Sequence, residues 1–199
     1  MIQEAAVERH CPATLELGGK SPQIVFADAD LDAIVGGIVQ NAGQTCSASS
    51  RLLVDQTIYE PLLERLGAAF EALRVGPANS DLDLGPLIRQ SQQQRVWDFL
   101  SNAHAANIPM VAQGSMVEEA PQSGFYQAPT LLRDVPVNHR LAQEEVFGPV
   151  LCAMPFQGED QAVALTNATQ FGLVAGIWKA DGAPVPHGPA HPQWPGVRQ

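Results

Sequence analysis

Residues 41–46 (NAGQTC) and residues 15–22 (LELGGKSP) organise this sequence. The first stretch delivers a single thiol, Cys46, after an apolar run, and the second delivers a carboxylate, Glu16, ahead of a double-glycine turn. A thiol and a carboxylate in one cleft provide the minimum for covalent catalysis followed by hydrolysis. Taken alone, a lone cysteine is more often a small buried apolar residue, and a carboxylate at a strand end is more often a surface charge.

Apolar segments with strand character alternate with amphipathic segments of helical length up to residue 181. We expect strands at 23–26, 51–54, 108–112, 150–154 and 173–178, and helices at 31–41, 58–73, 86–107 and 159–169. Residues 127–132 should be extended, residues 141–147 should form a short helix or turn, and residues 114–124 a polar loop. Alternation of this kind predicts an α/β fold with a mostly parallel sheet.

The composition excludes several classes of protein. A hydrophobic content of 45% with 16% charged residues is typical of a globular chain, and a net charge of -10 argues against nucleic acid as a partner. No apolar run is long enough to span a membrane, and no signal peptide is visible. Three cysteines without C-x-x-C spacing fit neither a disulfide framework nor a zinc site, so we expect no metal and a cytoplasmic location.

A third stretch, residues 144–150 (EEVFGPV), completes a pattern. Residues 15–22, 43–46 and 144–150 match, in the same order, the glutamate motif, the nucleophile motif and a further signature of the aldehyde dehydrogenase superfamily, which this chain resembles from about Pro12 to Asp181. The resemblance implies a three-layer catalytic domain with a mostly parallel sheet, incomplete at both ends and covering residues 1–181.

The resemblance also implies a reaction. Cys46 would attack an aldehyde to form a thiohemiacetal, hydride would pass to NAD or NADP, and water activated by Glu16 would hydrolyse the resulting thioester. An apolar setting would give Glu16 the basicity that a general base needs. By the same resemblance, Glu145 would hold the nicotinamide ribose and Phe147 would lie beside the nicotinamide ring, with a small-molecule aldehyde as the substrate.

Two alternatives stay open. In the family, most of the nucleotide-binding domain precedes the glutamate motif, and this chain begins only 15 residues before Glu16, so we expect that domain to be absent. Most contacts for the cofactor that accepts the hydride would then be missing. The family is oligomeric, and we expect its oligomerisation arm to be lacking here as well. The first alternative is therefore that the chain is an inactive remnant of such an enzyme. The second alternative is a thiol hydrolase that pairs Cys46 with His104 or His139, although neither histidine sits in a cysteine-protease motif.

Residues 182–199 differ from the rest of the chain. They contain five prolines and no Leu or Ile, and proline removes backbone donors, so we interpret them as a disordered Pro-rich tail. Back-translated with one permitted choice of codons and read one nucleotide later, residues 191–199 give a sequence of the kind that the family has there. We therefore hypothesise a frameshift near Gly182.

Overall fold

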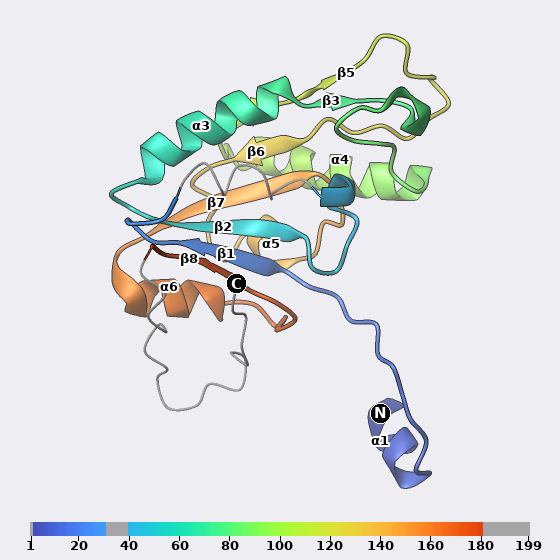
Figure 1. Cartoon of the computed structure of the whole chain (residues 1–199), viewed down its shortest axis with the longest axis vertical. Helices are drawn as coiled ribbons and strands as arrows, with labels where there is room; N and C mark the ends of the chain where they lie inside the picture. The colour runs from blue at the N-terminus through green and yellow to red at the C-terminus, as the bar shows by residue number, and fades with distance from the viewer. Residues whose placement is uncertain (1, 31–39, 181–199) are drawn as a thin grey trace.

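The computed structural model of this chain describes residues 2–30 and 40–180 (Figure 1). Within them, one six-stranded sheet has the order β4-β6-β7-β2-β1-β8. The strands are β1 (Ser21–Val25), β2 (Ser49–Asp55), β4 (Met110–Gln113), β6 (Thr130–Leu132), β7 (Val150–Phe156) and β8 (Gly176–Trp178). All neighbouring pairs are parallel except β4–β6. The expected mostly parallel α/β sheet is confirmed.

Helices cover both faces of the sheet. Helix α3 (Tyr59–Ala72) packs its apolar face on one side, against Leu52 and Val54 of β2. Helices α4 (Gln90–Ala105), α5 (Arg140–Gln143) and α6 (Gly158–Thr166) lie on the other, where Val96, Leu141 and Ala162 join one cluster of buried residues with the sheet. Helix, sheet and helix form the three layers that the resemblance implies (Figure 1).

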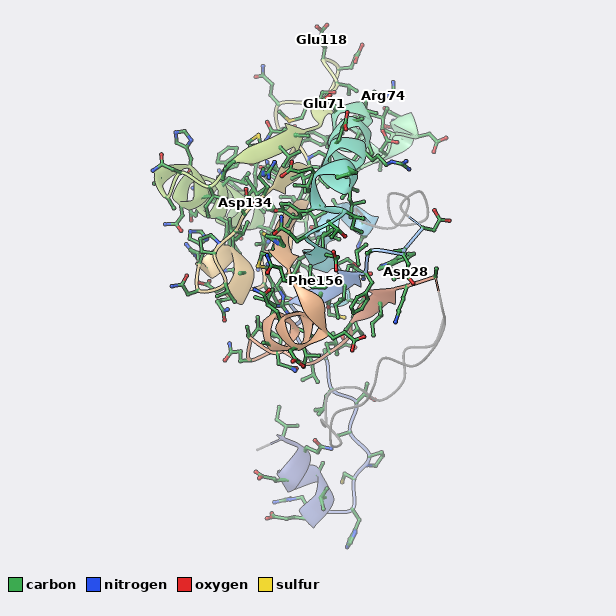
Figure 2. All side chains as sticks on the ribbon, turned by 90° about the vertical axis from the view of Figure 1, so that its left-hand side faces the viewer. Asp28, Glu71, Arg74, Glu118, Asp134 and Phe156 are labelled. Atoms are coloured by element: carbon green, nitrogen blue, oxygen red, sulfur yellow. The ribbon has the colours of Figure 1, made fainter. Side chains whose placement is uncertain are left out.

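The smaller elements lie in the connections. They are the two-stranded sheet of β3 (Arg74–Val75) and β5 (Ser115–Met116), and the 3-10 turns η1 (Gln40–Gly43) and η2 (Ala78–Ser80). Helix α1 (Ile2–Glu8) has no buried residue and lies away from the sheet at the end of an extended segment (Figures 1 and 2). None of the helices in the described ranges combines the length and apolarity needed to cross a membrane.

The boundaries differ from expectation at several points. The helix expected at 86–107 begins only at Gln90. Helical spacing over 86–107 would place Ile88 on the inward face, but Ile88 lies before the helix and is 76% exposed. The expected polar loop at 114–124 contains strand β5, which pairs through its backbone. The helix expected at 31–41 falls almost wholly on residues outside the described ranges, as does the tail at 182–199.

Candidate active site

The three motifs meet because each directly precedes one of three neighbouring strands. Gly19 lies just before β1, Cys46 just before β2, and residues 145–149 just before β7. These strands are adjacent and parallel, in the order β7-β2-β1. Their amino ends therefore share one edge of the sheet, at the right-hand side of Figure 1. Segments about a hundred residues apart in sequence are brought together there.

Glycine backbones join the loops at this edge. A Cβ atom on Gly19 would collide with the carbonyl oxygen of Cys46, and one on Gly43 would collide with the carbonyl oxygen of Gly148. The amide of Gly19 donates a 2.9 Å hydrogen bond to Oε1 of Glu145. Each loop thus contacts the next at a distance that only a residue without a side chain permits. Residues 43–48, which carry Cys46 and which we call the thiol loop, lie between the loop before β1 and the loop before β7.

The two predicted catalytic residues are in different environments. Cys46 is a free, half-buried thiol. Glu16 is exposed, which corrects the expectation of an apolar setting, because residues 11–18 are extended and exposed. Glu16 lies three residues before Gly19, a span of at most about 11 Å even in extended chain. The contact of Gly19 with Cys46 brings the backbone near the thiol loop, and convergence of the two side chains stays a prediction.

The predicted cofactor residues form a well-held loop. Glu145 and Phe147 are both half-buried, and Phe147 has a left-handed backbone with φ 58°. The Nε2 atom of Gln92, on α4, donates to the carbonyl oxygens of Val146 and Phe147 at 2.9 and 2.8 Å. These bonds fix the unusual backbone at Phe147.

Two buried cations lie next to the motif loops, and sequence reasoning missed both. Arg51 is 1% exposed, and its guanidinium donates to the carbonyl oxygens of Lys20, Leu165 and Thr166 at 2.8–2.9 Å. It thereby ties the start of β1 to the last turn of α6, where a cation is favoured by the helix dipole. Burial lowers the pKa of Arg51 to about 10, so it remains charged at neutral pH.

Lys20 is also 1% exposed, and its Nζ atom has no hydrogen-bond partner among the described residues. Burial is the main cause that lowers the pKa of this amine, and it likewise raises the pKa of the buried Cys152 thiol. Gly19, Lys20 and Ser21 match only the last half of a phosphate-binding motif, which carries no signal for a buried amine. The only feature of the sequence that pointed to Arg51 was its charge at the start of an apolar strand.

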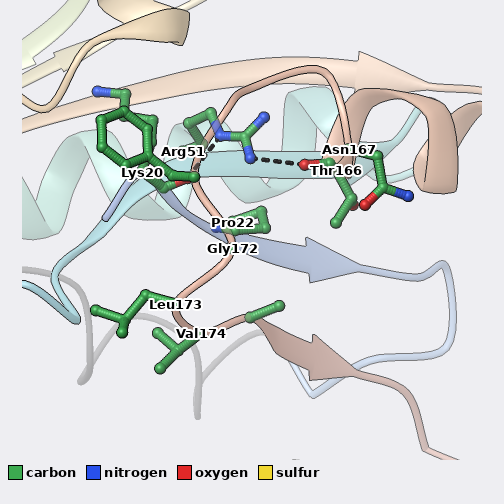
Figure 3. Close-up of a pocket in the computed structure, with 10 residues that line it drawn as sticks. Lys20, Pro22, Arg51, Thr166, Asn167, Gly172, Leu173 and Val174 are labelled. Carbon is green, nitrogen blue, oxygen red and sulfur yellow. Dashed lines mark hydrogen bonds between the residues drawn. The ribbon is translucent and has the colours of Figure 1, made fainter. Parts of the chain in front are cut away.

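Two hollows are lined in part by residues of the motif segments. The larger, about 350 Å³ of space open to solvent, has Arg51 between Lys20 and the pair Thr166 and Asn167 (Figure 3). Cys46 does not line it. The smaller, about 240 Å³, is closer to the predicted chemistry, since it lies between the thiol loop and the loop before β7 and is lined by Gly43, Ala48, Ser49, Ser50, Gly148, Pro149, Val150 and Leu151.

The histidines offer Cys46 little support. Nδ1 of His139 accepts a 3.2 Å hydrogen bond from the amide of Leu141 and so caps α5, and burial lowers the pKa of this imidazole. His104 lies in the last turn of α4, about 20 Å along the helix from its first residue. Across residues 2–30 and 40–180, no group of three His, Cys, Asp or Glu side chains is arranged to hold a metal ion.

The chain is thus a mostly parallel α/β domain in which a thiol loop lies between two other motif loops and contacts both through glycine backbones. A sequence model of the aldehyde dehydrogenase family matches residues 1–185, slightly more than the expected range. The chain belongs to the aldehyde dehydrogenase family.

Relatives extend this result. The chain is 41% identical over 185 residues to a betaine aldehyde dehydrogenase of Cereibacter sphaeroides, covering 90% of this chain and 38% of the relative. A crystal structure of a protein assigned as an aldehyde dehydrogenase in Burkholderia cenocepacia is 67% identical with a TM-score of 0.85, over 91% of this chain and 39% of that one. The NAD+ complex of an aldehyde dehydrogenase from Bacillus cereus is 32% identical with a TM-score of 0.80, over 90% and 37%. The chain thus spans well under half the length of the proteins it matches.

Proposed function

We propose that this chain provides the catalytic domain of an NAD(P)-dependent aldehyde dehydrogenase, which oxidises a small aldehyde to a carboxylic acid. The observation that carries the proposal is the meeting of the three motif loops at the amino ends of β1, β2 and β7. A nucleophile, a general base and a cofactor loop are thereby supplied from one edge of one sheet. Membership of the family supports the same conclusion.

Each step falls to a residue of this chain. The Cys46 thiolate attacks the aldehyde carbon to form a thiohemiacetal, and the backbone amide of Cys46 is the candidate donor to its oxyanion. A bound nicotinamide would supply the acceptor for the hydride that leaves this carbon, and Glu145 and Phe147 are the residues that would hold it. Glu16 then takes a proton from water, which attacks the Cys46 thioester and releases the acid. The exposure of Glu16 gives it direct access to that water.

The cofactor loop fits the nicotinamide half of the nucleotide. Oε1 of Glu145 accepts from the Gly19 amide, which orients the carboxylate and leaves Oε2 for the ribose hydroxyls. The ring of Phe147 follows two residues later on the backbone that Gln92 holds. NAD is the first cofactor to test, because the Bacillus cereus relative was solved as an NAD+ complex.

Betaine aldehyde is the first substrate to test. Relatives 38% and 41% identical to this chain, from Rhizobium johnstonii and Cereibacter sphaeroides, are named betaine aldehyde dehydrogenases. An uncharged aldehyde of similar size is the matched comparison. A preference for the cationic substrate would define the substrate class, and equal rates would broaden it to small aldehydes.

The thiol chemistry can be tested with an activated ester, with and without NAD. We expect the chain to hydrolyse p-nitrophenyl acetate, Cys46→Ala to fall to the uncatalysed rate, and Glu16→Gln to lose about 10²-fold. Cys11→Ala is the matched control, because Cys11 belongs to none of the three motifs and its exposed thiol is bonded within its own segment, to the carbonyl oxygen of Arg9. Equal turnover by the Cys46→Ala and Cys11→Ala variants would refute the proposed nucleophile.

A second candidate function is a folded, inactive remnant of such an enzyme. It is favoured by the exposed apolar side chains before β1, where Ile2, Val7 and Leu17 are 74%, 67% and 56% exposed. Apolar side chains gathered along one segment indicate a surface that another part of a protein covers. Binding of a fluorescent apolar dye, together with no ester hydrolysis, would favour the remnant over the enzyme.

The domain boundary is part of the proposal. We assign residues 1–181 to the catalytic domain and residues 182–199 to a tail created by a frameshift. Sequencing the gene through the codon for Gly182 tests this. Family-like codons in the shifted frame would support the frameshift, and stop codons there would overturn it.

A further inference from the structure

The amino-terminal end of α4 contacts two of the three motif loops. This end, which we call the α4 bracket, comprises residues 86–96. The loop before the helix is bonded to Gln44 of the thiol loop, and the first turns of the helix are bonded to residues 145–147 of the cofactor loop. Apart from Gln92, which holds the backbone at Phe147, no residue of the bracket takes part in the proposed reaction.

The Gln44 side chain makes two hydrogen bonds between the thiol loop and the bracket, one as the acceptor and one as the donor. Oε1 of Gln44 accepts a 2.9 Å hydrogen bond from the amide of Ile88, and its Nε2 donates to the carbonyl oxygen of Pro86 at 3.4 Å. Gln44 is two residues from Cys46. The Ile88 side chain is 76% exposed, so the position of this residue is fixed by its backbone rather than by burial.

The bonds to the cofactor loop reach three consecutive carbonyls. Arg95 donates to the carbonyl oxygen of Glu145 at 2.6 Å, and Gln92 donates to those of the next two residues. A left-handed backbone at a residue with a side chain, as at Phe147, is unfavourable. It persists where surrounding bonds over-determine it. A Cβ atom on Gly148 would collide with Val96, so the helix also packs directly on this loop.

We propose that the α4 bracket sets the position of the Cys46 thiol relative to the Glu145–Phe147 loop, with Gln44 and Gln92 as its positioning residues. This inference rests on the proposed function, in which the two loops supply the nucleophile and the nicotinamide site. Neither glutamine contacts the reacting atoms. Each acts through a backbone: Gln44 through the thiol loop and Gln92 through the cofactor loop, which touches the thiol loop where Gly43 meets Gly148.

The chain offers a matched control on the same helix. Gln93 is half-buried like Gln92 and its Nε2 donates a 2.7 Å bond to the carbonyl oxygen of Tyr126, in a segment that carries no motif. Gln92→Met and Gln93→Met therefore remove the same kind of bond from neighbouring positions. Only the first change releases a motif loop.

The test is the rate at which iodoacetamide alkylates Cys46, measured by peptide mass spectrometry in the 199-residue chain. Cys11 is exposed and serves as an internal reference within each sample, whereas Cys152 is buried. We expect Gln92→Met and Gln44→Ala to raise the ratio of the Cys46 rate to the Cys11 rate at least threefold, because Cys46 is half-buried when its loop is held. Gln93→Met should leave the ratio unchanged. Equal ratios in the Gln92→Met and Gln93→Met variants would overturn the proposal.

Cooperative urea unfolding establishes that each variant is folded. If Gln92→Met is not, Gln92→Asn replaces it, since the shortened amide reaches fewer carbonyls without removing the polar group. Hydrogen exchange in the unmodified chain is a further measurement, in which the Ile88 amide should be protected although its side chain is exposed. Rapid exchange at Ile88 would overturn the role of Gln44.

Adding NAD to the same assay separates the two proposals. If NAD alters the Cys46 rate in the unmodified chain and Gln92→Met removes that response, both proposals are supported. If NAD has no effect but Gln92→Met still raises the Cys46 ratio, the cofactor site fails and the positioning role stands. If NAD acts equally on the Gln92→Met and Gln93→Met variants and their ratios agree, the positioning role fails and the proposed function stands.

Discussion

The segments before and after Gly18 differ in how many contacts hold them to the rest of the chain. After Gly18, glycine contacts join the loops that carry Gly19, Cys46 and Gly148, and the Gly19 amide is bonded to the Glu145 carboxylate. The buried Arg51 ties the start of β1 to the end of α6. Before Gly18, residues 2–17 make an extended segment and a short helix without a buried residue (Figure 2). The predicted base lies before Gly18 and the predicted nucleophile after it. The thiol half of the site is therefore held by this chain's own contacts far more firmly than the carboxylate half.

The largest effect should come from the residue at the junction of the two regions. Arg51→Met removes three charge-assisted bonds and leaves the carbonyls of Lys20, Leu165 and Thr166 buried without their donor. We expect a loss of about 4 kcal/mol in the free energy of unfolding, measured with urea. Arg51→Lys should recover only part of it, because an ammonium group does not reproduce the guanidinium fork. A loss below about 1 kcal/mol would contradict the role of Arg51.

Gly43→Ala should come next. The added methyl group meets the Gly148 carbonyl, and φ is +70°, so overpacking and backbone strain add to a loss of about 3 kcal/mol. Gly158→Ala is the matched control, with φ +72° but open space around it, and should lose about 1 kcal/mol. Equal losses in urea unfolding would mean that the contact between the loops contributes nothing.

Lys20→Met tests the buried amine beside the motif loops. Burial lowers the folded-state pKa of Lys20 below 10.5. Between that lowered pKa and 10.5, the unfolded chain keeps a proton on Lys20 that the folded chain has lost. This group therefore makes the free energy of unfolding rise with pH in that window. Replacing it should stabilise the chain by about 1 kcal/mol at pH 7, less as the pH rises toward 9. Urea unfolding of both chains at the two pH values measures this, and a difference that grows with pH would contradict it.

The smallest effect should come from the other side of Gly18. Deleting residues 2–10 removes α1, which buries nothing, so the free energy of unfolding should change by less than about 0.5 kcal/mol. The thermal midpoint of the shortened chain measures it. A clear drop would show that this segment contributes to the fold and would remove the contrast between the two regions.

Sequence reasoning succeeded where information is local. The apolar run Leu52 to Val54 predicted β2, and the spacing of Leu62, Leu66 and Phe70 predicted the buried face of α3. The order of the three motifs predicted the family. Sequence reasoning failed where long-range contacts determine burial. Arg51 is buried because the end of α6 approaches β2. Glu16 is exposed because no other described segment covers residues 11–18. Ile88 was misplaced because the helix begins only at Gln90, after a loop bonded to Gln44.

The placement of β7 beside β2 has a consequence for biosynthesis. Strand β2 ends at Asp55, and β7, its neighbour on the side away from β1, begins only at Val150, so a growing chain emerging from the ribosome carries the Cys46 thiol long before β7 exists. Contacts between segments so distant in sequence also form slowly. The Cys46 thiol is therefore more exposed during synthesis than in the folded chain, where it is half-buried, and we expect it to need a reducing environment most during translation.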